Sequence, residues 1–189
     1  FQYDWRGRRE FVIPPADDEG RTVYTQSYYN NLDRVTKTEQ YHEQTASADI
    51  LIARNETYFD DRGQTYHTRR YGVDPATGTV GNHLASYTWF DAAGNTIKQQ
   101  AEGQRSFTKT AYDSLGRAIK QYVGYDLSES PCVDIGGSSS SSSSSSSCSD
   151  YTTATNVTGD TIFEQTETDY DDAGNAIETR MRRRHHDAT

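Results

Sequence analysis

The sequence predicts an all-β fold, a meander of antiparallel β-hairpins that forms part of a curved sheet, a spiral shell or a β-solenoid-like array. A six-residue turn pattern, aromatic-Asp-x-x-Gly-polar, recurs from one end of the chain to the other. The stretches between the turns are rich in Thr, Tyr, Val and Ile, which favour strands. No stretch shows helical periodicity or a helix capping box.

Residues 112–117 (YDSLGR) show the turn pattern in full, and further copies lie at 3–8, 59–64, 90–95 and 170–175. A degenerate copy at 29–34 has Asp33 in place of the glycine. An Asp at the first turn position can accept a hydrogen bond from the backbone N–H two residues later, and a Gly at the fourth position can take the positive φ that ends a type I turn with a bulge. Such a turn joins two antiparallel strands.

Weaker turns lie between these copies, so that many neighbouring turns are 13 to 16 residues apart. That interval fits one strand plus one turn. The predicted structural turn residues are Tyr3, Asp4 and Gly7; Asp17 and Gly20; Asp60 and Gly63; Asp74 and Gly78; Asp91 and Gly94; Tyr112, Asp113, Gly116 and Arg117; Asn156 and Gly159; and Asp171 and Gly174.

The strands predicted between the turns follow one another along the chain, with a polar loop at 42–49. Ile97, Ile119 and Ile177 each lie three residues after a turn glycine, where we expect them to be neighbours of the turn aromatics on the outgoing strand. The strands are expected at 22–29, 34–41, 50–59, 64–73, 79–90, 95–101, 105–112 and 117–125.

Three segments are expected: a hairpin array at 1–127, a Gly/Ser-rich insertion loop at 128–150, and further hairpins at 151–189. The insertion contains ten consecutive serines at 138–147, which behave as a flexible linker. Its ends carry the two cysteines of the chain, Cys132 and Cys148, so a disulfide is favoured over two free thiols and would imply an oxidising compartment.

Composition excludes several functions. The formal net charge of -9 argues against a nucleic-acid binder, which needs a surplus of cations. The basic run at 180–186 is interpreted as an arginine-rich strand rather than a patch for nucleic acid or lipid head groups. Only 32% of the residues are hydrophobic and the mean hydropathy is -0.95, so we expect no thick apolar core and no membrane span. The chain is interpreted as an excerpt of a longer protein.

No residue pattern indicates catalysis, a metal site or a cofactor. The five histidines, His42, His67, His83, His185 and His186, are not part of any recognisable catalytic motif. The acidic run at 169–174 resembles a calcium loop, but the register of that loop would require a Glu where Arg180 stands. We therefore expect a non-enzymatic protein without a cofactor.

The repeated Y-D-x-x-G-R pattern resembles the YD repeat of the RHS family. Residues 112–117 and 3–8 match that pattern fully, and 71–78 (YGVDPATG) are similar to the related Y-D-P-x-T-G form. Gln64, Asn95 and Asn175 depart from it where the family has arginine. The resemblance implies a hollow β-shell, a secreted or cell-surface protein, and a structural role in encapsulation, secretion or cell contact.

The implied partners are neighbouring repeats, other copies that pair through edge strands, an enclosed passenger or a cell-surface glycan. A second interpretation is a choline- or glucan-binding module, because 58–63 and 89–94 resemble the aromatic-aromatic-Asp-x-x-Gly core of cell-wall-binding repeats. Only two tryptophans, Trp5 and Trp89, are present to form the aromatic cages that such modules use.

Overall fold

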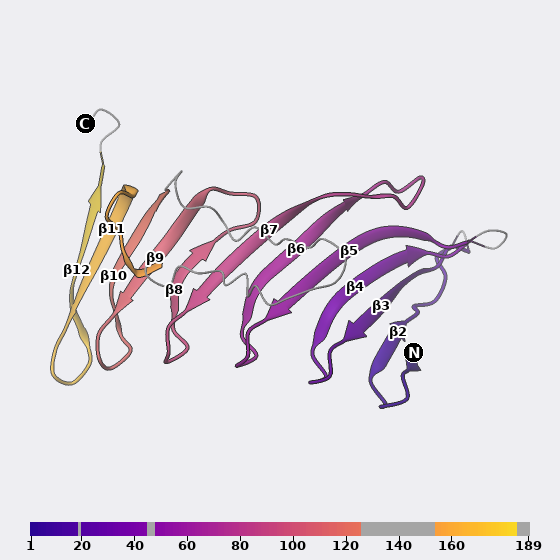
Figure 1. Cartoon of the computed structure of the whole chain (residues 1–189), viewed down its shortest axis with the longest axis horizontal. Coiled ribbons are helices and arrows are strands. Elements are labelled where there is room, and N and C mark those ends of the chain that lie inside the picture. Colours follow the sequence, from indigo (N-terminus) through magenta and orange to yellow (C-terminus); the bar gives the residue numbers. More distant parts are fainter. Residues whose placement is uncertain (19, 45–47, 126–153, 185–189) are drawn as a thin grey trace, which may run out of the picture. The chain divides into compact units, whose positions relative to one another are not determined.

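The computed structural model describes residues 1–18, 20–44, 48–125 and 154–184. Among them, twelve strands form one open sheet in which spatial order follows chain order, from β1 to β12 (Figure 1). The predicted fold class is therefore confirmed: the protein is an all-β meander of antiparallel hairpins. The expected insertion at 128–150 and the cysteines Cys132 and Cys148 lie outside the described residues.

The chain divides into two compact units, Phe1–Ser86 and Tyr87–Thr189, and β7 contributes to both. The strands of the first unit are β1 (Gln2–Tyr3), β2 (Arg9–Val12), β3 (Val23–Tyr29), β4 (Val35–His42), β5 (Ile50–Phe59), β6 (Thr65–Val73) and the start of β7 (Val80–Phe90). The second unit contains the end of β7, then β8 (Thr96–Gln100), β9 (Ser106–Tyr112), β10 (Ala118–Tyr125), β11 (Thr161–Tyr170) and β12 (Ala176–Arg183).

The full aromatic-Asp-x-x-Gly turns alternate with the weaker ones. The full turns connect β1 to β2, β5 to β6, β7 to β8, β9 to β10 and β11 to β12, and the degenerate copy connects β3 to β4. Because successive strands run in opposite directions, the full turns of a unit lie at one end of its strands and the weaker turns at the other end (Figure 1). A signature turn therefore follows every second strand, with a weaker turn or loop after each strand in between.

Two details differ from the sequence-based expectation. Gly103 has a φ of 67° in a turn that carries no Asp-x-x-Gly signature. The turn at 156–160 closes with a hydrogen bond from the Asp160 N–H to the Val157 carbonyl, 3.2 Å, and leads into β11 instead of joining two successive strands directly. The reason is that β10 ends at Tyr125 and its partner β11 begins only at Thr161.

The buried side chains of the described residues are as often polar or charged as apolar. Leu51, Ile97 and Phe107 are buried, whereas Ile177 is 66% exposed. Ile177 lies on β12, the last strand in the sheet order, all of whose residues are exposed. The buried charged or polar residues are Glu39, His67, Lys98 and Lys109.

Candidate functional site

The 112–117 turn shows what each residue of the signature does. The Gly116 N–H donates to the Asp113 carbonyl and the Asp113 N–H to the Arg117 carbonyl, both at 3.0 Å. Asp113 Oδ1 accepts the N–H groups of Leu115 and Arg117 at 2.9 Å, and Arg117 Nε donates to Asp113 Oδ2 at 2.7 Å. These donors lower the pKa of Asp113, with the Arg117 backbone N–H as the largest cause. Gly116 has a φ of 78°.

The same contacts recur at the other turns. Position six supplies a donor to the aspartate: Arg8 Nε lies 2.6 Å from Asp4 Oδ2, and the amides of Asn95 and Asn175 reach the equivalent Oδ2 at 2.9 and 3.0 Å. An asparagine at position six therefore makes the same hydrogen bond to the turn aspartate that arginine makes in other turns. Positive φ values are found at Gly7, Gly20, Gly63, Gly78, Gly94, Gly159 and Gly174, and at Asp33, where φ is 60°.

The weaker turns use related contacts. Asp17 accepts Arg21 Nε at 2.8 Å. Asp74 accepts the Gly78 N–H on its carbonyl at 2.8 Å, in a loop that is one residue longer. Asn156 Oδ1 accepts the Thr158 N–H at 2.9 Å.

In the full turns, Asp60, Asp91 and Asp171 each accept the backbone N–H four residues later, at 2.7–2.8 Å.

Arginine at position six also reaches the next repeat. The guanidinium carbon of Arg117 lies 4.6 Å from the centroid of the Tyr170 ring, and Arg8 and Arg34 lie 4.7 and 4.9 Å from the rings of Tyr29 and Phe59. Each aromatic ring belongs to the following full or degenerate turn. The signature arginine thus links consecutive hairpins by a cation–π contact.

The tyrosine that precedes a turn completes this link. The hydroxyl of Tyr170 donates to the Ala118 carbonyl at 3.0 Å, and that of Tyr112 to the Thr96 carbonyl at 2.9 Å. Both carbonyls belong to the first residue of the outgoing strand of the preceding hairpin. Tyr3, in contrast, lies on the first strand and is 58% exposed. We call each pair of consecutive signature turns, together with the two strands between them, a junction; at three junctions an arginine–aromatic contact joins the two turns.

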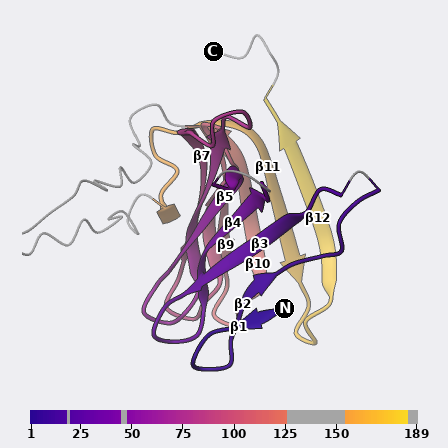
Figure 2. The same cartoon turned by 90° about the vertical axis from the view of Figure 1, so that its right-hand side faces the viewer.

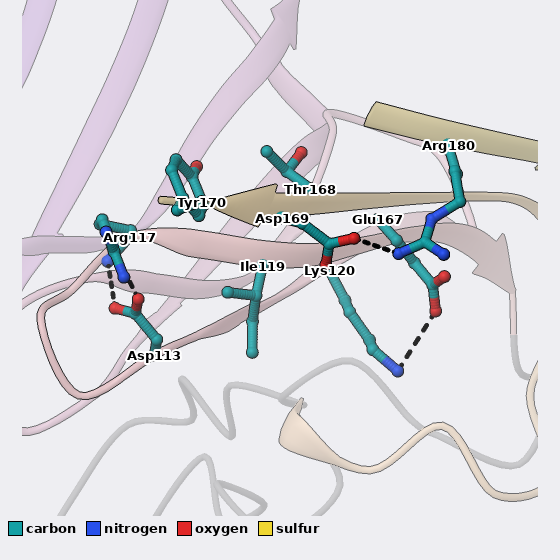
Figure 3. A pocket seen from close by; sticks show the side chains of 9 residues that line it. All are labelled: Asp113, Arg117, Ile119, Lys120, Glu167, Thr168, Asp169, Tyr170 and Arg180. Carbon is teal, nitrogen blue, oxygen red and sulfur yellow. Dashed lines mark hydrogen bonds and ion pairs between the residues drawn. The ribbon is translucent and has the colours of Figure 1, made fainter. Parts of the chain in front are cut away.

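Two junctions contain a pocket at equivalent positions. The one in the second unit, about 390 Å³, lies beside Arg117 and Tyr170 and is lined by Lys120 and Glu167, whose Nζ and Oε1 are 3.3 Å apart (Figure 3). The one in the first unit, about 400 Å³, has Arg34, Phe59, Lys37 and Glu56 at the corresponding positions. In the second-unit pocket the charged side chains pair with one another, whereas Lys37 and Glu56 of the first-unit pocket pair with Glu39 and Arg69 outside it. Nothing in either lining arranges a nucleophile beside a base.

A second recurring cluster lies on one face of β3–β6, and the sequence pattern alone did not predict it. The buried Glu39 accepts the hydroxyls of Tyr28 and Tyr41 on Oε2 at 2.6 and 2.9 Å, and Arg54 Nε on Oε1 at 2.7 Å. Burial raises the pKa of Glu39, but these hydrogen bonds and that of Lys37 outweigh it and lower the pKa to about 2.

Glu56 forms a similar cluster on β5, the strand next to the one that carries Glu39. Its Oε2 accepts the hydroxyls of Tyr58 at 2.7 Å and Tyr71 at 2.8 Å, with Arg69 Nη1 4.0 Å away. Both clusters contain Glu-x-Tyr on a single strand, at 39–41 and 56–58. That short pattern is the signal that could have predicted them, since residues i and i+2 of a strand share a face.

Neither a metal site nor a membrane-spanning helix is found among the described residues. No group of three or more His, Cys, Asp or Glu side chains could hold a metal ion there. No described helix is long and apolar enough to cross a membrane.

No protein-family model matches the chain, and no curated protein matches it. Among solved structures, a crystal structure of TcdB2-TccC3-Cdc42 is similar, with a TM-score of 0.33 and 16% sequence identity. The match covers 89% of this chain and 9% of that chain. At these values the likeness carries no functional argument, so the function is inferred from the contacts within the chain.

Proposed function

We propose that the chain is a non-enzymatic structural segment of a large secreted or cell-surface protein with YD repeats of the RHS type, where it forms part of a β-shell or scaffold for encapsulation, secretion or cell contact. The observation that carries the proposal is the recurring junction, in which Arg8, Arg34 and Arg117 each stack on the aromatic residue of the next turn. Such nearest-neighbour contacts are what an array of repeats needs for stability.

The chemistry of the signature supports this role. The carboxylate of Asp113 and the guanidinium of Arg117 are both engaged by the turn and the following repeat. A carboxylic acid that donates a proton in catalysis needs a pKa raised towards neutrality, whereas the turn contacts lower the pKa of Asp113. The signature residues therefore act on their neighbours in the array and not on a substrate.

The alternative, a choline- or glucan-binding module, depends on Trp89. Tyr87 lies 5.9 Å from the Trp89 ring, which is compatible with an aromatic cage. However, Lys98 Nζ lies 4.8 Å from the centroid of the same ring. A choline ammonium would compete with this lysine for the ring face, because both are attracted by its electron density.

An affinity test on the purified chain separates the two functions. Wild type and Trp89→Ala are passed in parallel over immobilised choline and immobilised glucan. A structural segment passes through both resins in both forms. Retention of the wild type that Trp89→Ala loses would replace the structural proposal with the binding module.

A repeat-duplication variant provides the positive test. Inserting a second copy of residues 30–59 after position 59 adds two strands and a second Arg34–Phe59 junction, while every turn keeps its preceding aromatic residue. A repeat array should accept this insertion and unfold cooperatively with an unchanged β-sheet circular dichroism signal per residue. An aggregated or unstructured product would contradict the array model.

A further inference from the structure

The Arg34–Phe59 and Arg117–Tyr170 junctions share a cross-strand pair. The Arg8–Tyr29 junction lacks it, since Phe11 lies opposite Gln26 there, and the junction between β8 and β9 replaces it. Three residues after the signature arginine stands a lysine, Lys37 or Lys120, and three residues before the next aromatic stands a glutamate. The strand register places Lys37 opposite Glu56 and Lys120 opposite Glu167. Opposite charges at facing positions of antiparallel strands stabilise the pairing.

At the junction between β8 and β9 the glutamate is replaced by a second lysine. Lys98 lies three residues after Asn95, and the residue opposite it, three residues before Tyr112, is Lys109. Like charges at facing positions are unfavourable, and these lysines are only 5% and 2% exposed. The two ammonium groups lie 4.9 and 4.5 Å from the centroid of the same ring, that of Phe107.

The segment that leads into β11 supplies a carboxylate to this position. Asp160 Oδ2 lies 2.7 Å from Lys109 Nζ, and the Asn156 carbonyl accepts a hydrogen bond from the same Nζ at 2.7 Å. The side chains of Lys109 and Asp160 are 2% and 1% exposed, and Ala154 is fully buried. In Figure 2 the orange segment before β11 lies beside the strands of its unit, outside their plane.

We propose that the Lys98–Lys109 pair is a docking site for a segment of the polypeptide that carries a carboxylate, and that residues 154–160 occupy it as a strap held by Asp160. The strap fixes where the chain rejoins the sheet after the 128–150 insertion. It also binds the ammonium group of Lys109 through Asp160 and the Asn156 carbonyl. Lysine at position 109 therefore distinguishes this junction from the two that have a Lys–Glu pair. It forms an ion pair with Asp160, 51 residues away in the sequence, instead of a glutamate there pairing with the facing lysine within the sheet. This inference does not depend on the proposed function.

Charge reversal with amide hydrogen exchange tests the strap. In Lys109→Glu, the new glutamate faces Lys98 as Glu167 faces Lys120, so β9 should stay protected and the melting temperature close to that of the wild type. Asp160 is then repelled, and exchange of the 154–160 amides should accelerate at least about tenfold, since local opening follows the lost buried ion pair. Asp160→Lys should have the same effect on these amides.

The double variant Lys109→Glu/Asp160→Lys restores the pair with reversed charges, and we expect it to recover most of the protection of 154–160. Lys120→Glu is the matched control, because it breaks the Lys120–Glu167 pair at the equivalent position of another junction and should leave 154–160 unchanged. Wild-type exchange at 154–160 in both single variants would overturn the proposal. So would a double variant that exchanges as fast as the singles while β9 stays protected.

Discussion

Arg117 and Tyr170 are 53 positions apart in the sequence, yet the guanidinium carbon of the first lies 4.6 Å from the ring centroid of the second. Arg117 also binds Asp113 within its own turn and reaches the Asp171 carbonyl at 3.4 Å. A single side chain therefore closes one turn and attaches it to the next. This dual contact explains physically what an arginine at the last position of the signature contributes to the fold.

Replacing this arginine should destabilise the protein. Arg117→Ala loses the cation–π contact and the charged hydrogen bond from Nε to Asp113, and we expect a loss of about 1–2 kcal/mol in the free energy of unfolding. Urea denaturation of the wild type and the variant measures it. Arg183→Ala is the matched control, because Arg183 forms an exposed ion pair with Glu164 on the last hairpin and should cost less than about 0.5 kcal/mol. Equal losses in the two variants would contradict the role of the junction.

The fold was predictable because its information is local. Asp113 and Gly116 determine a turn of four residues, and the alternation of turns and β-forming stretches then leaves little choice but a meander. The junctions were not predictable, since the register that brings Arg117 to Tyr170 depends on how the chain returns after the long connection between β10 and β11. The Glu39 cluster was not predicted for a related reason: the side chains that donate hydrogen bonds to Glu39 come from three strands, and the sequence alone does not give the register of these strands.

An added arginine should strengthen the junction between β8 and β9, where Asn95 stands in place of the arginine. Asn95 binds Asp91 within its turn, and its Oδ1 lies 3.9 Å from where a Gly116 Cβ would be, so its side chain already points towards the next turn. We expect Asn95→Arg to stack on Tyr112 and to raise the free energy of unfolding by about 0.5–1 kcal/mol.

The control for this gain is Asn175→Arg. Asn175 makes the same contact with Asp171, but no aromatic turn follows it within 176–184. The substitution at Asn175 should therefore change the melting temperature little. A gain of the same size at both positions would show that arginine stabilises its own turn and not the junction.

Two glycines should resist substitution for different reasons. Gly116→Ala meets no atom closer than 3.9 Å, so its expected cost of about 1 kcal/mol is backbone strain at a φ of 78°. Gly124→Ala would place its Cβ 2.5 Å from the Thr161 carbonyl oxygen and 2.9 Å from Ile162 Cδ1. The second variant must separate β10 from β11 locally, and we expect it to cost more than the first in chemical denaturation. The reverse order would contradict the geometry of the β10–β11 pair.

Acid should weaken the first unit through Glu39. Its folded-state pKa of about 2 lies below the ordinary value of 4.5, so the deprotonated form is preferred in the folded protein. The contribution of Glu39 to stability is fully present above about pH 4.5 and is lost as the pH falls towards 2. The difference in unfolding free energy between wild type and Glu39→Gln, measured from about pH 7 to pH 2, should therefore shrink below about pH 4.5. A difference that stays constant over this range would show that Glu39 is not held as a carboxylate.

The outer strands should promote association at micromolar concentration. All eight residues of β12 are exposed, including Ile177 at 66% and Met181 at 55%, and its outer side pairs with no strand among the described residues. Open strand edges pair with other strands unless charge, proline or a covering segment prevents it. Mass photometry should detect dimers or longer species of the wild type, and Ile177→Lys/Met181→Lys should shift them to monomer because it adds charge to the apolar face of the edge. Leu115→Lys, at an exposed turn, is the matched control and should associate like the wild type. A wild-type protein that is monomeric throughout would contradict the prediction and show that the open edge of β12 does not promote association.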